Sequence, residues 1–226
     1  MDNGSVDGTV ALIEKLRCGR DSFVLPIYLE KNTGTTCSRN LALKRARGKY
    51  ICVMDSDVIL QKGTLSALIQ ILESESSAGL VAPRLVYPDG RWQKSTDDFP
   101  TIFTKIRRYF WLRNIEKRES KASKTENPVP VDYAISAFWV LKKEVLEKIG
   151  LLDENIFYAP EDVDYCLRIW LGGYKVLYSA QNQVTHDAQE ISRNWKLNLS
   201  TIRHIKGLLY YFRKHRYIFR KPLVPV

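Results

Sequence analysis

Near the start of the chain, segments with helically spaced apolar side chains alternate with short runs of apolar residues. Residues 9–17 and 38–47 have apolar positions three or four apart, the spacing of one helix face, and Gly48 follows the second run as glycine often follows a helix end. The apolar runs 24–29 and 50–54 are short, as buried strands are. The pattern predicts a helix, a strand, a helix and a strand, in that order.

The rest of the chain continues this alternation. Apolar patterns and flanking glycine or proline residues predict helices at 63–72, 143–149 and 161–171, and strands at 79–83, 131–141 and in two short runs that end near Tyr178 and His186. Residues 85–93 are predicted to form a hairpin, because Asp89-Gly90 favours a two-residue turn. Residues 97–130 are basic, and we expect them to be irregular with a helical middle.

Strands that alternate with helices across short loops indicate an α/β fold. We expect a mostly parallel sheet flanked by helices on both faces, because the helices that connect parallel strands cover the sheet. Ligands of such sheets bind at the carboxyl ends of the strands. Polar residues that follow predicted strands are therefore the first candidates for chemistry.

The composition fits one globular domain with an appendage. The 226 residues, 45% of them apolar and 27% charged, are enough to bury a sizeable core. The longest apolar runs, such as 135–141, are far shorter than the roughly 20 residues of a membrane-spanning helix. The N-terminus has neither the basic flank nor the apolar run of a secretory signal. We expect a cytoplasmic protein.

The net charge of +10 is concentrated in two segments. Residues 193–226 hold nine Lys and Arg and no acid, and residues 104–124 hold eight Lys and Arg with two Glu, so the rest of the chain is net acidic. We expect a main domain over 1–191 and a basic helical tail over 192–226. Aromatic and basic residues interleave in this tail, so it can lie on an anionic membrane surface, or its aromatic face can pack on the domain.

The cysteines do not predict a disulfide framework or a zinc site. Cys18, Cys37, Cys52 and Cys166 lie far apart, without a Cys-x-x-Cys pair. Cys52 and Cys166 stand within apolar patterns, where a free thiol packs as a small apolar side chain. We expect buried, reduced thiols.

Two carboxylates follow the predicted strand 50–54. Asp55 and Asp57 emerge together at its carboxyl end, and a hard divalent cation commonly binds through one or two carboxylates while substrate phosphates fill other positions. The sequence alone leaves a second interpretation open, a solvated turn in which Asp57 caps the next helix.

A second acidic cluster, Glu161-Asp162-Val163-Asp164, opens the helix after Pro160. Acids favour the first turn of a helix for electrostatic reasons, but one of these could also be a general base that takes the proton of an attacking hydroxyl. His186 ends a short strand and is either structural or a metal ligand. His204 and His215 lie in the basic tail, where we expect solvated side chains.

Several further motifs complete the pattern, and together they resemble glycosyltransferase family 2, of GT-A fold, and within it the rhamnosyltransferase-like members. The likeness spans nearly the whole chain in the family's order. Its motifs are Asp2-Asn-Gly-Ser-Val-Asp-Gly-Thr9, Asn32-Thr-Gly34 with Ser38-Arg39-Asn40, Ala46-Arg-Gly48 leading to Asp55-Ser56-Asp57, Ala82 to Gly90, Val131 to Ala137, Gly150 to Glu154, Pro160 to Arg168, Gly173 to Val176, and His186.

The resemblance implies an inverting glycosyltransferase that moves a sugar, with rhamnose as a candidate, from a nucleoside diphosphate to a hydroxyl of a glycan or lipid-linked acceptor in polysaccharide or glycolipid synthesis. It implies that Asp55 and Asp57 bind the diphosphate through Mg²⁺ or Mn²⁺, with His186 as a further ligand. Asp162 would be the general base, with its neighbour Glu161 as the second choice. The implied substrate-binding residues are Asp2, at the nucleotide base, Gly34, Arg39, Asp55 and Ser56.

The chain departs from the family pattern at two points. Members normally open with a strand, a turn and a helix before the Asp-Asn-Gly-Ser motif, whereas Met1 directly precedes it here. We therefore expect a GT-A-like domain that is N-terminally truncated, and an inactive remnant that binds nucleotide or a partner is the main alternative. Ser136-Ala137 stands where Gly-Ala is usual, a change that could tighten the acceptor side.

Two other classes of protein fit the sequence less well. A nucleotidyltransferase also uses carboxylates at strand ends, but residues 1–50 contain no glycine-rich basic loop for a triphosphate. A nucleic-acid-binding module would explain the basic residues, but the charge lies in two segments and not over the whole body. We therefore expect no nucleic-acid partner, and an anionic membrane surface remains a candidate partner at the cytoplasmic face.

Overall fold

The computed structural model describes residues 1–19, 23–104, 125–188 and 199–224. Its helices are α1 (Thr9–Arg17), α2 (Thr35–Leu43), α3 (Thr64–Ser74), α5 (Lys143–Ile149), α6 (Glu161–Leu171) and α7 (Leu199–His215). Its strands are β1 (Tyr50–Met54), β2 (Val58–Leu60), β3 (Ala78–Val86), β4 (Trp92–Gln93), β5 (Thr96–Asp97), β6 (Val129–Pro130), β7 (Tyr133–Ala134), β8 (Phe138–Lys142) and β9 (Lys175–His186).

Within the described ranges, one sheet forms the centre of the molecule, with its strands in the order β1-β8-β3-β9-β2. β3 and β9 are parallel, whereas β8 is antiparallel to both β1 and β3, and β2 is antiparallel to β9. The α/β fold is confirmed, but the sheet is mixed and not mostly parallel. The reason is that β8 enters between β1 and β3, which themselves run in the same direction.

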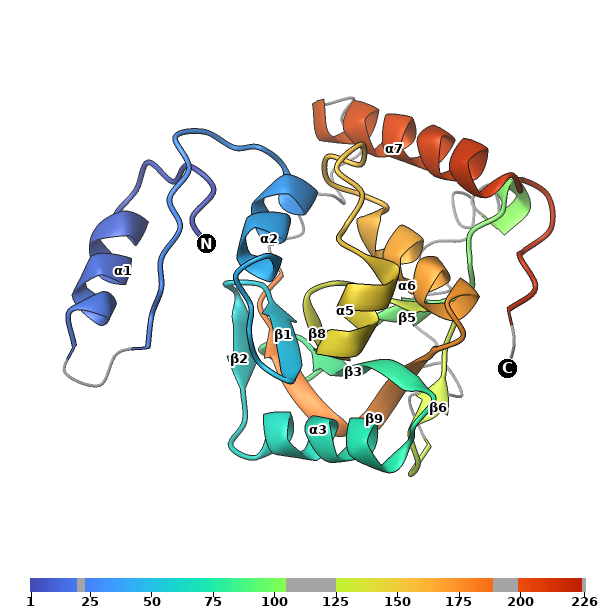
Figure 1. Ribbon diagram of the computed structural model, residues 1–226, viewed down its shortest axis with the longest axis horizontal. Coiled ribbons are helices and arrows are strands. Elements are labelled where there is room, and N and C mark those ends of the chain that lie inside the picture. Colours follow the sequence, from blue (N-terminus) through green and yellow to red (C-terminus); the bar gives the residue numbers. More distant parts are fainter. Residues whose placement is uncertain (20–22, 105–124, 189–198, 225–226) are drawn as a thin grey trace.

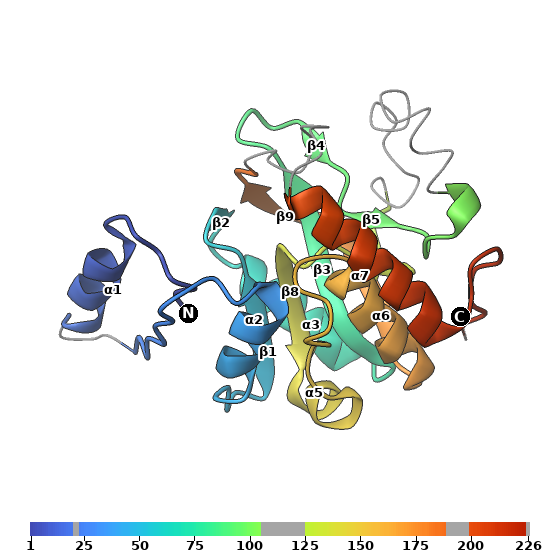
Figure 2. The same ribbon diagram turned by 90° about the horizontal axis from the view of Figure 1, so that it is seen from above.

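Helices cover both faces of this sheet (Figure 1). α3 packs on one face, where Leu68 and Leu72 are fully buried against strand residues such as Val81 and Val140. α2, α5 and α6 cover the other face over a second core, and α7 lies outside α6 and runs alongside it in Figure 2. Alternate strand side chains supply the two cores, as the period of a strand requires.

The N-terminal segment forms an arm beside this body (Figure 1). α1 has no buried residue, and the predicted strand 24–29 is wrong apart from a single bridge between Tyr28 and Asp2. Leu25 is 85% exposed. A strand needs a neighbour to pair with and an apolar face to bury, and residues 24–29 have little of either in the described structure.

Several element boundaries differ from the predicted ones. α2 starts three residues early, at Thr35, because its first turn is tied to residues 156 and 157. The predicted strand 131–141 is two separate strands, β7 and β8, with β6 just before it. Asp132, between β6 and β7, accepts the backbone N–H of Phe99 with its carboxylate. The two predicted strands before His186 are one strand, β9. The helical middle predicted within 97–130 falls largely on 105–124, outside the described residues.

The predicted hairpin exists, but its loop is longer than predicted. β3 and β4 pair through Leu85 with Gln93 and through Val86 with Trp92, so residues 87–91 form the loop. Gly90 takes a φ of 80° within it, as a glycine does readily. The two-residue turn was wrong because the Tyr87 carbonyl accepts the N–H of Gly90 and the Tyr87 N–H donates to the Arg91 carbonyl, which leaves three residues, 88–90, in the turn.

α7 is docked on the domain. Tyr211 is fully buried and Phe212 nearly so, and a Cβ on Gly207 would lie 2.2 Å from the carbonyl oxygen of Ala159. The buried carboxylate of Asp164 accepts a hydrogen bond from His215 Nε2 at 2.8 Å, so the prediction of a solvated ring was wrong for this histidine. The predicted domain boundary at 191/192 lies outside the described residues.

The cysteines divide between core and surface. Cys166 is buried in the core, as predicted, whereas Cys18 and Cys52, the latter on the edge strand β1, are exposed, which corrects the prediction for both. All four are free thiols. Across the described parts of the chain, none of the helices has both the length and the apolar character that a membrane crossing requires.

Candidate functional site

A cavity of about 1140 Å³ opens beyond the carboxyl end of β1. Its wall brings together residues from α2, from the turn after β1, from the segment before β8, from the first turn of α6, from the end of β9 and from α7. The polar residues that line it are Asn3, Thr35, Ser38, Arg39, Asp55, Ser56, Asp57, Gln93, Lys94, Ser136, Glu161, Asp162, His186 and His204.

Three potential metal-ligating side chains converge on one side of this cavity. One ligand atom each from Asp55, Asp57 and His186 lies within 4.8 Å of the others. Asp55 leaves the end of β1, where its backbone N–H bonds the carbonyl of Ala137 at 2.9 Å. Asp57 and His186 are brought together because Val58, the next residue, pairs with His186 in the sheet.

The contacts of these side chains fit a divalent cation. Asp57 Oδ1 is inaccessible to solvent and has no hydrogen-bond partner among the described residues, although His186 Nε2 lies 3.4 Å away. His186 is buried, and its Nδ1 forms a hydrogen bond with Gln93 Oε1 at 2.9 Å. Carboxylate oxygens and an imidazole nitrogen are ligands for Mg²⁺ or Mn²⁺. An orphaned buried carboxylate oxygen beside them is what a cation would satisfy.

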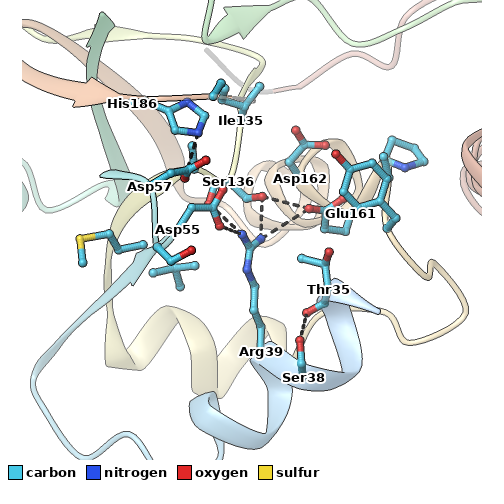
Figure 3. Close-up of a pocket in the computed structure, with 18 of the residues that line it drawn as sticks. Thr35, Ser38, Arg39, Asp55, Asp57, Ile135, Ser136, Glu161, Asp162 and His186 are labelled. Atoms are coloured by element: carbon cyan, nitrogen blue, oxygen red, sulfur yellow. Dashed lines mark hydrogen bonds and ion pairs between the residues drawn. The ribbon is translucent and has the colours of Figure 1, made fainter. Parts of the chain in front are cut away.

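Arg39 joins the two acidic sides of the cavity (Figure 3). Its guanidinium extends from α2 and donates to Asp55 Oδ1 at 2.5 Å and to Ser136 Oγ at 2.6 Å, with Glu161 Oε1 at 3.5 Å. Burial raises the pKa of Asp55, and the neighbouring Arg39 opposes this shift. Arg39 thus keeps positive charge in the cavity between Asp55 and Glu161.

Glu161 and Asp162 stand at the start of α6 but differ in their surroundings. Glu161 is buried, and its Oε1 accepts a hydrogen bond from Ser136 Oγ at 2.9 Å. Burial, followed by repulsion from Asp162, raises the pKa of Glu161 well above its usual range. Asp162 is more exposed and lies across the cavity from Asp57 in Figure 3. Both carboxylates line the cavity.

The remaining predicted residues lie behind the cavity wall. The carboxylate of Asp2 accepts the backbone N–H groups of Gly4 and Ser5, and hydrogen bonds from Ser5 and Gly4 lower its pKa. Gly34 precedes α2 with a φ of 89°. Neither lines the cavity, although their neighbours Asn3 and Thr35 do.

Two polar residues of the site carry roles that the sequence did not reveal. Gln93 holds the ring of His186, and His204 reaches the cavity from α7. Gln93 lies in a short strand with no motif around it, so only the hairpin register could have pointed to it. Ser136 stood out as a departure, but its bonds to Arg39 and Glu161 depend on the fold.

One family profile matches this chain. The profile of glycosyl transferase family 2 matches residues 1–150. The N-acetylglucosaminyl-diphospho-decaprenol L-rhamnosyltransferase of Mycobacterium tuberculosis is 25% identical over 240 residues, which cover 98% of this chain and 76% of that protein. The cholesterol galactosyltransferase of Borreliella burgdorferi is 23% identical over 79% of this chain and 48% of its own.

Solved glycosyltransferase structures share the fold. GalNAc-T7 with UDP, GalNAc and Mn²⁺ aligns with a TM-score of 0.67 and 14% identity over 94% of this chain. The mannosyltransferase PcManGT of Pyrobaculum calidifontis, in complex with GDP-Man and Mn²⁺, aligns with a TM-score of 0.63 and 18% identity over 98% of it. This chain spans 40% and 55% of the two structures' lengths, and at these identities the likeness shows the GT-A fold alone.

Proposed function

The chain belongs to glycosyl transferase family 2, and on that premise we propose that it is a metal-dependent, inverting glycosyltransferase. It moves a sugar from a nucleoside diphosphate to a hydroxyl of a glycan or lipid-linked acceptor. The observation that carries this proposal is the cavity itself, because Asp55, Asp57 and His186 face it from one side and Glu161 and Asp162 from the other. A cation site and a candidate base thus share one space.

The donor side of the reaction is assigned to the turn after β1 and to α2. Asp55, Asp57 and His186 would hold Mg²⁺ or Mn²⁺, and a cation held there would offset the charge that develops on the leaving diphosphate. The guanidinium of Arg39 lies beside Asp55 and can donate to phosphate oxygens. Ser56 lines the same wall, whereas Gly34 and Asp2 shape the loops behind it.

Asp162 is the proposed general base. It lines the cavity and is less buried than Glu161, so an acceptor hydroxyl can approach it more freely. Glu161 is engaged with Ser136 and lies near Arg39, and this engagement suits a residue that orients the arginine. In a single displacement, the base removes the proton of the acceptor hydroxyl as that oxygen attacks the anomeric carbon, which inverts its configuration.

We propose rhamnose as the first donor sugar to test. The support is the similarity over 98% of this chain to an L-rhamnosyltransferase, which is 25% identical. That relative is named for a decaprenol-linked acceptor, and another relative for cholesterol, so a lipid-linked acceptor is the first acceptor class to test.

An anionic membrane surface is the proposed partner of α7. The outer face of this helix exposes Ile202, Ile205 and Leu209, which are three and four residues apart and therefore form one stripe. Lys206 and Arg213 are exposed on the same helix, and residues 193–226 contain no acid. An apolar stripe with basic neighbours binds the interface of an anionic bilayer. α7 also carries His204, so the membrane would lie close to the cavity.

Product analysis tests the transfer reaction. The protein would be incubated with thymidine diphosphate rhamnose or other nucleotide sugars, Mn²⁺ or Mg²⁺, and a polyprenyl diphosphate sugar. We expect release of nucleoside diphosphate, its loss on addition of a chelator, and a product of inverted anomeric configuration by NMR. Asp162→Asn should lower the rate at least about 100-fold while nucleotide binding is retained. A retained configuration would refute the single displacement.

Calorimetry separates an active enzyme from an inactive remnant. Binding of nucleoside diphosphate with Mn²⁺, but no transfer to any acceptor, would favour the remnant. Asp57→Asn should abolish the metal-dependent part of binding, and Asp89→Asn, an exposed aspartate in the β3–β4 loop, is the matched control. Equal binding by both variants would remove the support for the cation site.

Vesicle flotation tests the membrane partner. Ile205→Ser with Leu209→Ser should weaken binding to vesicles that contain phosphatidylglycerol. Leu12→Ser with Leu16→Ser changes two comparably exposed apolar residues on α1 and serves as the control. Point substitutions are preferable to removal of α7, since Tyr211 is part of the core. Equal flotation of both double variants would refute the assignment of this face.

A further inference from the structure

We infer that Gln93 is a positioning residue that fixes the ring tautomer of His186, so that Nε2 presents a lone pair to the cation site. The inference rests on the proposed function in one respect, the assignment of Asp55, Asp57 and His186 as ligands. The orientation of the ring itself is independent of that assignment, and it can be tested without metal.

The sheet brings Gln93 and His186 together although they are 93 positions apart. Gln93 pairs with Leu85 across β4 and β3, and Leu85 pairs with Val184 across β3 and β9. Directly paired residues point to the same face of a sheet, and so does the residue two further along a strand. Gln93 and His186 therefore share a face. Both side chains are buried, so neither reorients freely.

Two arrangements of the pair are chemically possible. In the first, His186 Nδ1–H donates to Gln93 Oε1, and Nε2 carries the lone pair. In the second, the Gln93 amide donates to Nδ1, and Nε2–H points toward Asp57. Gln93 Oε1 lies 2.9 Å from Nδ1, as the first arrangement requires, whereas the second would turn the amide over and place its nitrogen there.

The contacts of Asp57 favour the first arrangement. If Nε2 carried the proton, the nearby carboxylate would be its natural acceptor. Yet Asp57 Oδ1 lies 3.4 Å from Nε2 and has no hydrogen-bond partner among the described residues, although it is shielded from solvent. A lone pair on Nε2 and an unpaired carboxylate oxygen face the same point, as two ligands of one cation would.

The two ring nitrogens of His186 would then have different roles. One nitrogen is held by the protein so that the other is available, an arrangement that is common where histidine binds a metal. A glutamine holds the ring without adding a charge next to Asp55 and Asp57. The loss of such an outer partner typically weakens metal affinity roughly 10- to 100-fold.

Nitrogen-15 NMR tests the inference directly. Long-range proton–nitrogen spectra of the protein without added metal, at alkaline pH where the rings are neutral, report which nitrogen of His186 is protonated. Neutral histidine in water favours the Nε2–H form, so an Nδ1–H form in the native protein would be distinctive. The chain has three histidines, and spectra of His204→Gln and His215→Gln assign the remaining signal.

Three variants complete the test, with Mn²⁺ affinity from calorimetry as a second readout. Gln93→Leu should lose the Nδ1–H form and bind Mn²⁺ roughly 10- to 100-fold more weakly. Gln93→Glu offers another acceptor and should keep the Nδ1–H form. Gln181→Leu, an exposed glutamine on the same strand as His186, should behave as the native protein. Circular dichroism confirms that each variant is folded.

The outcomes separate the two proposals. An Nε2–H ring in the native protein would overturn the role of Gln93 even if Mn²⁺ binds, and so would an unchanged tautomer and Mn²⁺ affinity in Gln93→Leu. An Nδ1–H ring that Gln93→Leu abolishes, in a protein that does not bind Mn²⁺, would support the positioning by Gln93 and refute the cation site.

Discussion

Gly34 holds the start of α2 against the loop that precedes α6, and its replacement by alanine should be unusually costly. Gly34 has a φ of 89° and a ψ of 168°, a region of backbone conformation that essentially only glycine adopts. A Cβ there would lie 2.4 Å from the carbonyl oxygen of Phe157. That oxygen accepts the backbone N–H of Thr35 at 2.8 Å, so the loop cannot retreat without breaking this bond.

The magnitude follows from these three effects. Backbone strain at such a position costs about 1–3 kcal/mol, overpacking against a fixed atom adds a similar amount, and a lost hydrogen bond costs about 1 kcal/mol. We expect Gly34→Ala to lower the free energy of unfolding by about 4 kcal/mol. Domains are commonly stable by about 5–15 kcal/mol, so the variant should still fold.

Gly63 provides the matched control. It has the same φ of 89°, also directly before a helix, but apart from its own chain neighbours and helix backbone no atom of the described residues lies within 4 Å of the position that a Cβ would take there. Gly63→Ala should therefore cost only the strain of a left-handed alanine, about 1–2 kcal/mol. Urea unfolding followed by circular dichroism measures both free energies. Equal losses in the two variants would refute the claim that contact with Phe157 makes Gly34 necessary.

Three further predictions concern α6 and α7. Asp164→Asn should lower the free energy of unfolding by about 3 kcal/mol in urea at neutral pH, because the carboxylate is buried with Arg168 and Lys214. Burial would raise the pKa of Asp164, but hydrogen bonds and charges from its partners lower it. The carboxylate therefore stabilises the folded protein above its usual pKa of 3.8, and this stabilisation is lost as pH falls through the lowered pKa. Acid titration of Asp164→Asn should therefore show a smaller loss of folding stability with falling pH. Ser136→Ala removes a hydrogen bond that lowers the pKa of Glu161, so carbon-13 NMR titration should find that pKa raised further. Gly207→Ala places a Cβ 2.2 Å from a carbonyl oxygen and should displace α7, seen as faster hydrogen exchange in that helix.

Local patterns determined which elements the sequence could predict. The bounds of β1, α5 and α6 match the predicted ones, because each carries its own markers, such as Gly150 after α5 and Pro160 before α6. Elements that depend on distant partners were missed or misjudged. β8 takes its direction from β1 and β3, and residues 24–29 form a single bridge, between Tyr28 and Asp2, where a strand was predicted.

The residues of the candidate site likewise fall into those that local patterns could predict and those that depend on the fold. Asp55, Asp57, Glu161, Asp162 and His186 stood out because acids and histidine at strand and helix ends are visible in the sequence, and the structure places them around one cavity. Gln93 and the bonds of Ser136 could not be predicted, since a glutamine or serine acquires such a role only from what the fold sets beside it.

One irregularity of the sheet explains why the three potential ligands meet. Pro83 pairs with Ser179 but the next residue, Arg84, pairs with Gln183, so residues 180–182 form a bulge in β9. A bulge bends its strand and is frequent beside functional sites.

Beyond this bulge, the end of β9 pairs with β2, and the turn 55–57 spans the short distance from β1 to β2. The carboxylates of that turn therefore face the last residue of β9, His186. A β9 without the bulge would shift its register against β3 and turn this histidine to the other face, because neighbouring strand residues alternate between faces.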